Sequence, residues 1–158
     1  MAGGRADLGI GVWDSEHQAL EFTPYKTDEL VLIVPNSHPL ASKDSVRFNE
    51  CANEPFVCLQ SDSAIHMFMV KLAHELGHRL DVRVQVSRFG TVAGLVAAGV
   101  GIGIIPRSIF LDAGKGFQAV KLDEPWAARR LSVCVRCDIG AATPTDLLRR
   151  HLAKRRGT

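Results

Sequence analysis

The chain has 158 residues, of which 46% are hydrophobic, and a formal net charge of +2. This length suffices for one domain or two small lobes, and the small charge gives no indication of nucleic-acid binding. No apolar run reaches the roughly 18 residues of a membrane-spanning helix. The N-terminus lacks a signal-peptide pattern, so we expect a cytoplasmic protein whose four cysteines are reduced thiols.

Apolar periodicity and turn residues predict alternating strands and helices along most of the chain. Strands are predicted over 7–13, 20–26, 29–34, 55–60, 82–87, 102–105, 117–122 and 131–136. Short helical turns or helices are predicted over 46–51, 64–76, 91–98, 108–113 and 143–155. This alternation is typical of an α/β fold.

The helix predicted over 64–76 follows three polar residues, Ser61-Asp62-Ser63, that offer caps for its first turn. Its apolar residues recur at helical spacing and predict one buried face. These residues are Ile65, Phe68, Met69, Leu72 and Leu76. Gly77 is expected to end the helix.

The most informative stretch runs from Thr91 to Pro106. Its first half predicts a buried helix, with Gly90 and Thr91 at its start, where threonine is a good N-cap. Gly99 and Gly101 are expected to end this helix in the left-handed conformation. The apolar run that follows predicts a buried strand that Pro106 stops. The pattern is that of the second half of a βαβ crossover.

Strands joined by single helices favour a parallel sheet, and ligands of such sheets bind at the carboxyl ends of the strands. Two strand-to-helix junctions fall on that edge, over 60–63 and 89–91. Both offer hydroxyl groups and free backbone N–H groups, which suit a small carboxylate or another anion. The alternative is that Ser61, Ser63 and Thr91 only cap their helices. The pairing of both junctions on one edge favours a binding site.

Residues His74, Glu75 and His78 match the HExxH pattern, which on a helix brings two zinc-binding histidines together with a glutamate base. Because Gly77 is expected to end the helix, His78 should turn away from His74. The longer zinc-protease pattern is not continued in the residues that follow. We therefore favour histidines at a helix end and keep a zinc hydrolase as an alternative function.

The remaining chemical motifs are weak. Cys134 and Cys137 have CxxC spacing, but on a strand residues three apart point to opposite faces, and no second CxxC completes a zinc site. Cys51 and Cys58 are expected to be small buried apolar residues. The glycines near position 100 follow a helix instead of preceding one, and neither GxGxxG nor GxSxG occurs, which argues against a dinucleotide site and a serine hydrolase.

Four segments stand out by their order and spacing: DLGI at 7–10, DELVLIVP at 28–35, HPLA at 38–41 and LVAAGVGIGIIP at 95–106. Together they resemble the effector-binding half of LysR-type transcriptional regulators. The resemblance implies a type 2 periplasmic-binding-protein-like α/β fold, with one complete lobe around a mixed or parallel sheet and part of a second lobe.

By this resemblance lobe II would be 26–122, and 5–25 with 123–158 would be the remaining part of lobe I. Crossing strands near 23–27 and 122–126 would act as hinges. The DNA-binding helix-turn-helix domain and the first elements of lobe I are expected to be absent from these 158 residues. A shortened lobe I would expose apolar surface and a sheet edge, which predicts self-association.

The resemblance further implies a non-enzymatic sensor without metal, cofactor or catalytic residues, which binds a small, carboxylate-bearing effector between its lobes. The implied effector contacts are Ser61, Ser63, Phe89, Gly90 and Thr91, with Ile104 and Pro106 at the mouth of the site. The expected partners are a second copy in a homodimer or homotetramer, and DNA only through the helix-turn-helix domain, with no membrane. A solute-binding protein of the same fold is an alternative, which the missing signal peptide disfavours.

Overall fold

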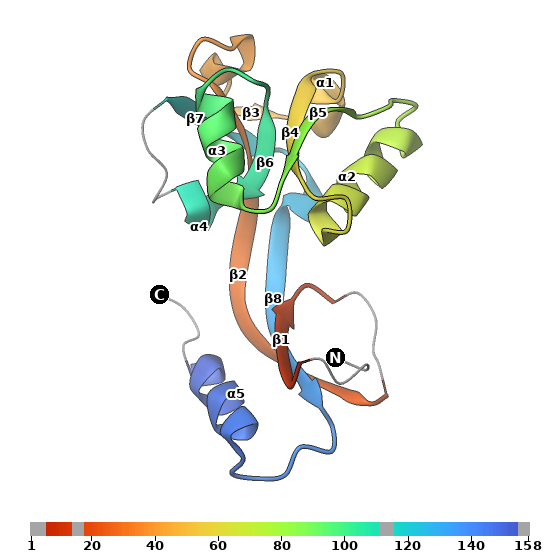
Figure 1. The fold of residues 1–158 in the computed structure, drawn as a ribbon, viewed down its shortest axis with the longest axis vertical. Helices are drawn as coiled ribbons and strands as arrows, with labels where there is room; N and C mark the ends of the chain where they lie inside the picture. The colour runs from red at the N-terminus through yellow and green to blue at the C-terminus, as the bar shows by residue number, and fades with distance from the viewer. Residues whose placement is uncertain (1–5, 14–17, 111–115, 155–158) are drawn as a thin grey trace. The chain divides into compact units, whose positions relative to one another are not determined.

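A computed structural model describes residues 6–13, 18–110 and 116–154 of the chain. The backbone divides into two compact units (Figure 1). Unit 1 comprises Met1–Asp28 and Arg129–Thr158, and unit 2 comprises Glu29–Ala128. The predicted lobe II, 26–122, overlaps unit 2, and equating the two remains a prediction. No helix in the described part of the chain is both long enough and apolar enough to cross a membrane.

The secondary structure alternates between strands and short helices. The strands are β1 (Leu8–Gly11), β2 (Leu20–Pro35), β3 (Ser45–Val46), β4 (Pro55–Leu59), β5 (Asp81–Val86), β6 (Gly103–Pro106), β7 (Phe117–Leu122) and β8 (Ala128–Arg136). The helices are η1 (Pro39–Ser42), α1 (Phe48–Cys51), α2 (Ala64–Glu75), α3 (Phe89–Ala97), α4 (Arg107–Phe110), η2 (Pro125–Ala127) and α5 (Pro144–Lys154). The predicted ends of two helices, at 111–113 and 155, lie outside the described residues.

β2 is a single long strand, where the sequence predicts two separate ones. It has 16 residues and continues through both Pro24 and the acidic pair Asp28-Glu29. Its neighbours change along its length, since it pairs with β8 as well as with β6 and β7. Pairing with successive partners therefore keeps the strand extended across residues that locally favour a break.

The larger sheet is mixed, which agrees with the predicted mixed or parallel arrangement. The parallel pairing that the single-helix crossovers favour does not extend to β6 and β7. β6 pairs with β2 antiparallel, with Leu32 opposite Ile104, and β7 also pairs with β2 antiparallel. β3 pairs with β7 in parallel. After α3 the chain first runs parallel to β4, through the bridge between Ile102 and Phe56, as a βαβ crossover requires. It then continues as β6, which pairs with β2 and not with β4.

A second sheet, β4 and β5, is parallel as predicted, and α2 and α3 cover its opposite sides (Figure 1). On the α2 side, Phe56 and Cys58 pack in a cluster with Met69. On the α3 side, Val57 packs with Val92 and with other apolar residues of α3 and β6. Both faces of β4 are therefore buried, which explains its continuous apolar sequence.

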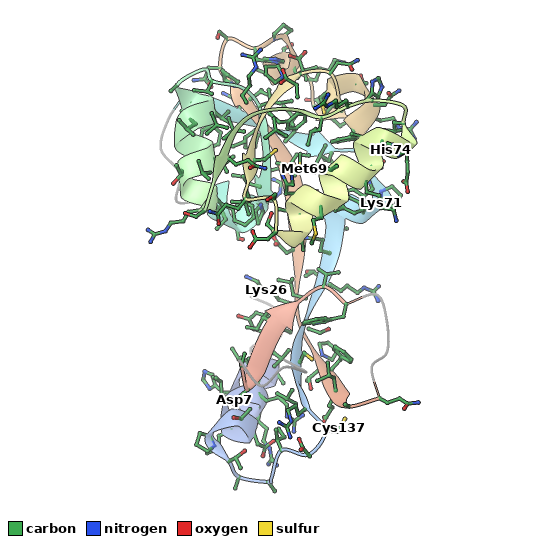
Figure 2. All side chains as sticks on the ribbon, turned by 45° about the vertical axis from the view of Figure 1, so that its right-hand side comes forward. Asp7, Lys26, Met69, Lys71, His74 and Cys137 are labelled. Carbon is green, nitrogen blue, oxygen red and sulfur yellow. The ribbon has the colours of Figure 1, made fainter. Side chains whose placement is uncertain are left out.

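Helix α2 buries a face that differs in part from the predicted one. Met69 is 3% exposed as expected, but Phe68 and Leu76 are 38% and 42% exposed. His66 is buried instead, with 7% exposure. Figure 2 shows Met69 on the inner side of α2 and Lys71 and His74 along its outer side. Phe68 lies at the edge of the buried face, where its ring packs against Trp126 of η2 with 5.2 Å between the ring centroids. Apolar spacing alone does not distinguish such an edge position from a core position.

Helix α3 begins at Phe89, and Arg88 is its N-cap, so the predicted N-cap role of Thr91 is wrong. Gly99 ends the helix region with φ of 80°, as predicted. Gly101 has a different role, because a Cβ at this position would lie 2.4 Å from the carbonyl oxygen of Pro55. A glycine is required there by the close approach of two chain segments and not by a left-handed turn.

The described part of unit 1 contains β1, the first half of β2, β8 and helix α5. β1 pairs antiparallel with β8, which neighbours β2. Helix α5 is attached by polar contacts: Arg149 donates to Glu21 (3.0 Å) and Thr23 (3.3 Å) of β2, and to Asp146 (2.8 Å) on its own helix. Asp146 also accepts from the Ala142 N–H at 3.1 Å. These bonds hold the pKa of Asp146 at about 2, with Arg149 as the main cause.

Several large apolar side chains of unit 1 are exposed. Ile10, Val12 and Trp13 are between 44% and 48% exposed, and Leu147 and Leu148 of α5 are 58% and 48% exposed. β1 lies at the end of the strand order, with β8 as its partner among the described strands. Such surfaces are typical of contacts with another polypeptide segment.

Candidate functional site

The two junctions that the sequence singles out lie next to each other in the structure. β4 and β5 end side by side, with Leu59 opposite Val86. Just beyond the ladder, the Gln60 N–H donates to the Val86 carbonyl at 3.0 Å. The loop that enters α2 and the loop that enters α3 therefore start from the same edge of the sheet. We refer to residues 60–63 and 87–91 together as the junction edge.

At the first junction, Ser63 is the N-cap of α2. Its side-chain oxygen accepts from the His66 N–H at 3.2 Å, so one predicted site residue has the capping role that was its alternative interpretation. Ser61 and Asp62 are exposed in the turn before it. A cap that is already bonded to the helix has less capacity to bind a ligand, and Ser61 is the freer hydroxyl of this junction.

At the second junction, Phe89, Gly90 and Thr91 form the first turn of α3. The N–H groups of Phe89 and Gly90 have no acceptor within the helix, because the first intrahelical bonds begin later. The Thr91 N–H donates to the Arg88 carbonyl at 3.1 Å. Nothing lies within 4 Å of a Cβ placed on Gly90, so the space in front of this turn is open. Phe89 is half-buried against the α3-side core.

Arg88 is a candidate that the sequence prediction missed. It is exposed and lies between the end of β5 and the first turn of α3. Among the described residues its side chain has no hydrogen bond or ion pair, although Asp62 belongs to the same edge. A guanidinium group beside free N–H groups completes the set of donors that a carboxylate requires. Its position directly before the predicted contact Phe89 is the feature of the sequence that could have indicated it.

The two residues predicted at the mouth of the site are buried. Ile104 is 4% exposed and packs in the core on the α2 side, and Pro106 ends β6 opposite Leu30. The structure therefore brings Ser61, Ser63 and the Phe89–Thr91 turn together at one edge, and places Ile104 and Pro106 in the interior beneath it. Their role as effector contacts remains a prediction.

The HExxH residues do not form a helical pair. α2 ends at Glu75, and Gly77 has φ of 76°, as predicted. Beyond this turn, His78 Nε2 lies 3.1 Å from Asn49 Oδ1, while Glu75 pairs with Lys71 at 3.7 Å. Within 6–13, 18–110 and 116–154, no cluster of three or more His, Cys, Asp or Glu side chains is arranged to hold a metal ion.

The cysteines are free thiols in the structure. Cys51 and Cys58 are buried as predicted, and burial raises their pKa values to about 12 and about 11, which makes both thiols unreactive. Burial also raises the pKa of the Cys134 thiol. Cys137 is exposed, just beyond the end of β8.

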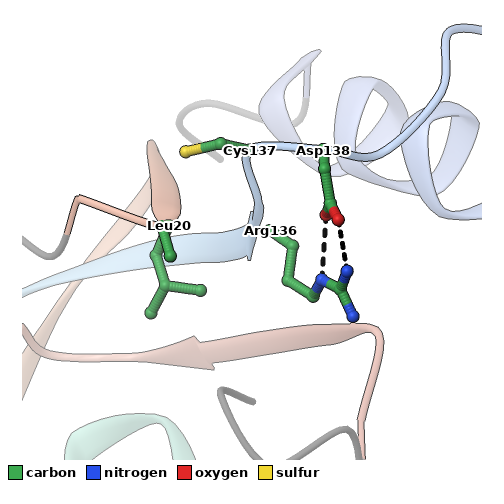
Figure 3. Close-up of a pocket in the computed structure, with 5 residues that line it drawn as sticks. Leu20, Arg136, Cys137 and Asp138 are labelled. Carbon is green, nitrogen blue, oxygen red and sulfur yellow. Dashed lines mark hydrogen bonds and ion pairs between the residues drawn. The ribbon is translucent and has the colours of Figure 1, made fainter.

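A pocket of about 460 Å³ lies beside Cys137 in unit 1 (Figure 3). Ala19, Leu20, Arg136 and Asp138 also line it. Arg136 and Asp138 pair with each other there, with 2.8 Å between Arg136 Nε and Asp138 Oδ1. None of the described residues that line the pocket is a predicted effector contact, and Arg136 is neutralised by Asp138.

Comparison with known proteins identifies the class. Residues 1–156 match the family described as the LysR substrate binding domain, and the chain belongs to this family. The uncharacterized HTH-type transcriptional regulator YybE of Bacillus subtilis is 38% identical over 115 residues, which are 73% of this chain and 39% of YybE. The chain spans between a third and a half of the length of the curated relatives it matches. The family consists of transcription regulators and not of enzymes.

Solved structures show the same fold. The effector-binding domain of QuiR in complex with shikimate has a TM-score of 0.78 at 22% identity, over 98% of this chain and 73% of that chain. The effector-binding domain of BenM with benzoate has a TM-score of 0.74 at 23% identity, over 97% of this chain and 70% of that one. The predicted periplasmic-binding-protein-like α/β fold, with a mixed sheet and a small parallel sheet, is thereby confirmed.

Proposed function

We propose that the chain is the ligand-sensing domain of a LysR-type regulator and that it binds a small carboxylate at the junction edge. The observation that carries this proposal is the meeting of two helix N-termini at one sheet edge, with the exposed Arg88 as the N-cap residue of α3. Backbone N–H groups and the positive end of each helix dipole favour an anion there. Shikimate and benzoate, which accompany QuiR and BenM, both carry a carboxylate.

The proposed recognition divides the ligand between two kinds of contact. The carboxylate accepts hydrogen bonds from the first turn of α3 and from Arg88, and the Ser61 hydroxyl binds a second polar group. Phe89, half-buried at the start of α3, lies against the apolar part of the ligand. In the complete sensor the second lobe closes on the ligand, and closure changes the packing of a homo-oligomer in the cytoplasm. DNA contact is made by a helix-turn-helix domain outside these 158 residues.

A thermal-shift experiment with a matched pair of ligands tests the proposal. Benzoate and its neutral analogue benzamide have nearly the same shape and differ in charge. Benzoate at about 100 times its Kd should stabilise the chain by roughly 2.7 kcal/mol, and benzamide should have little effect. Thr91→Ala should reduce the benzoate shift. No shift with benzoate, shikimate or a wider panel of carboxylates would contradict the proposal.

A further inference from the structure

Two consecutive acidic residues of β2 hold two arginines in different units. The boundary between the units passes between Asp28 and Glu29, and again between Ala128 and Arg129. Asp28, in unit 1, accepts from Arg129 with 2.5 Å between Oδ2 and Nη2. Glu29, in unit 2, accepts from Arg107 Nε at 2.7 Å. One peptide bond therefore joins an ion pair of one unit to an ion pair of the other.

The ion pair of unit 1 is largely withdrawn from water. The Asp28 side chain is 7% exposed and that of Arg129 is 22% exposed. Arg129 Nε is buried and has no partner in the described part of the chain. A buried pair is strongly sensitive to the loss of one member, because the remaining charge is uncompensated. This pair ties β2 to β8 at the point where both strands leave unit 1.

The ion pair of unit 2 lies at the end of the ladder between β2 and β6. Arg107 is the first residue of α4 and directly follows Pro106, which is opposite Leu30 in the β2–β6 ladder. Glu29 and Arg107 thus continue this ladder by one position. β6 packs against α3 in the same apolar cluster, so Arg107 follows directly on a strand that contacts this helix.

We infer that the Asp28-Glu29 dipeptide is a coupling element, which transmits a change at the β6–α4 end of unit 2 to strand β8 of unit 1. The path is Arg107 to Glu29, across one peptide bond to Asp28, and on to Arg129. The inference rests on the proposed function only for its regulatory meaning, because the mechanical coupling exists without a ligand. These four side chains act as positioning residues and not as ligand contacts.

Hydrogen exchange of the amides over 130–136 tests the coupling in the ligand-free chain. Arg107→Gln breaks the pair in unit 2 and should accelerate exchange in β8 by about threefold or more. Lys43→Gln is the matched control, because Lys43 and Glu50 also form a partly exposed pair of unit 2 at 2.7 Å. This control should leave exchange in β8 unchanged. Equal effects of both substitutions on β8 would overturn the inference.

The double substitution Asp28→Asn with Arg129→Met removes both charges of the second half of the path. In this background Arg107→Gln should no longer affect β8. If the double variant does not fold, Arg129→Lys, which keeps the charge and loses the planar fork, should transmit less than the wild type does. An undiminished response of β8 in either background would contradict the proposed path.

Benzoate binding then separates the coupling from the proposed function. If both are correct, benzoate changes exchange over 130–136 in the wild type but not in the double variant. If benzoate and shikimate do not bind while Arg107→Gln still accelerates exchange in β8, the proposed function fails and the coupling stands. If benzoate binds and Arg107→Gln has no effect on β8, the coupling fails and the proposed function stands.

Discussion

Unit 2 encloses two apolar clusters, one on each side of β4, whereas the buried apolar side chains described in unit 1 are those of Val133, Cys134 and Val135 in β8. Helix α5 of unit 1 is instead anchored by Arg149 and Asp146. Unit 2 therefore has the interior of an independent domain, whereas unit 1 depends on polar bonds and leaves apolar surface for another segment to cover.

The largest expected effect concerns the apolar interior of unit 2. Met69 and Met67 lie on the same helix, with exposures of 3% and 55%. Met69→Ala should lower the free energy of unfolding of unit 2 by about 2–5 kcal/mol, because it leaves a cavity. Met67→Ala should change it by less than about 0.5 kcal/mol. Urea denaturation of both variants measures the difference, and similar losses would show that the α2 face is wrongly assigned.

The second prediction asks whether unit 2 carries the ligand site. Arg88→Gln should weaken benzoate binding by about tenfold, since a charge-assisted hydrogen bond contributes roughly 1.5–3 kcal/mol. Arg79→Gln is the matched control, because Arg79 is another exposed arginine of unit 2 without an ion pair among the described residues. Isothermal titration calorimetry provides the affinities. Equal affinities in the two variants would remove Arg88 from the site.

The third prediction concerns the polar anchor of unit 1. The pKa of Asp146 is lowered from 3.8 to about 2 in the folded state, so its charge stabilises α5 above about pH 4 and this contribution is lost as the pH falls from 4 toward 2. Hydrogen exchange of α5 amides between about pH 5 and pH 2, corrected for intrinsic rates, should show this loss. Asp146→Asn should remove the pH dependence, and an unchanged profile would contradict the account.

The smallest effect concerns the exposed surface of unit 1. Ile10 lies on the edge strand β1 and is 48% exposed. Ile10→Lys should reduce self-association of the chain, because a charge on an edge strand opposes pairing with another strand. Val70→Lys, at a 43% exposed position of α2, is the comparison in unit 2. Sedimentation velocity measures both, and an equal or larger effect of Val70→Lys would move the association surface to α2.

Local sequence was sufficient for most elements of the fold. A continuous apolar run predicted β4, alternation predicted β5 and helical spacing predicted α2. Gly77 and Gly99 marked helix ends that the structure confirms. Sheet topology was less accessible, because the antiparallel pairing of β6 with β2 depends on contacts between distant residues. The continuity of β2 across Asp28 and Glu29 likewise follows from its partners and not from local preference.

The sequence predicted the location of the candidate site but not all of its residues. The two junctions were found because strand-to-helix turns and hydroxyl residues are visible in the sequence, and the structure brings them to one edge. The true start of α3 at Phe89 was missed, since Arg88 is an uncommon N-cap. Because the helix was predicted to begin two residues later, Arg88 was not recognised as a cation of the junction edge. The burial of His66 was missed because histidine carries no apolar signal.

The most direct test of the account is an NMR titration of the isotope-labelled chain with benzoate, followed through its backbone amide resonances. We expect benzoate to produce saturable shifts concentrated at 61–64 and 88–91, and benzamide to produce none. Shifts centred on the Cys137 pocket, or spread over the exposed apolar surface of unit 1, would contradict a carboxylate site at the junction edge.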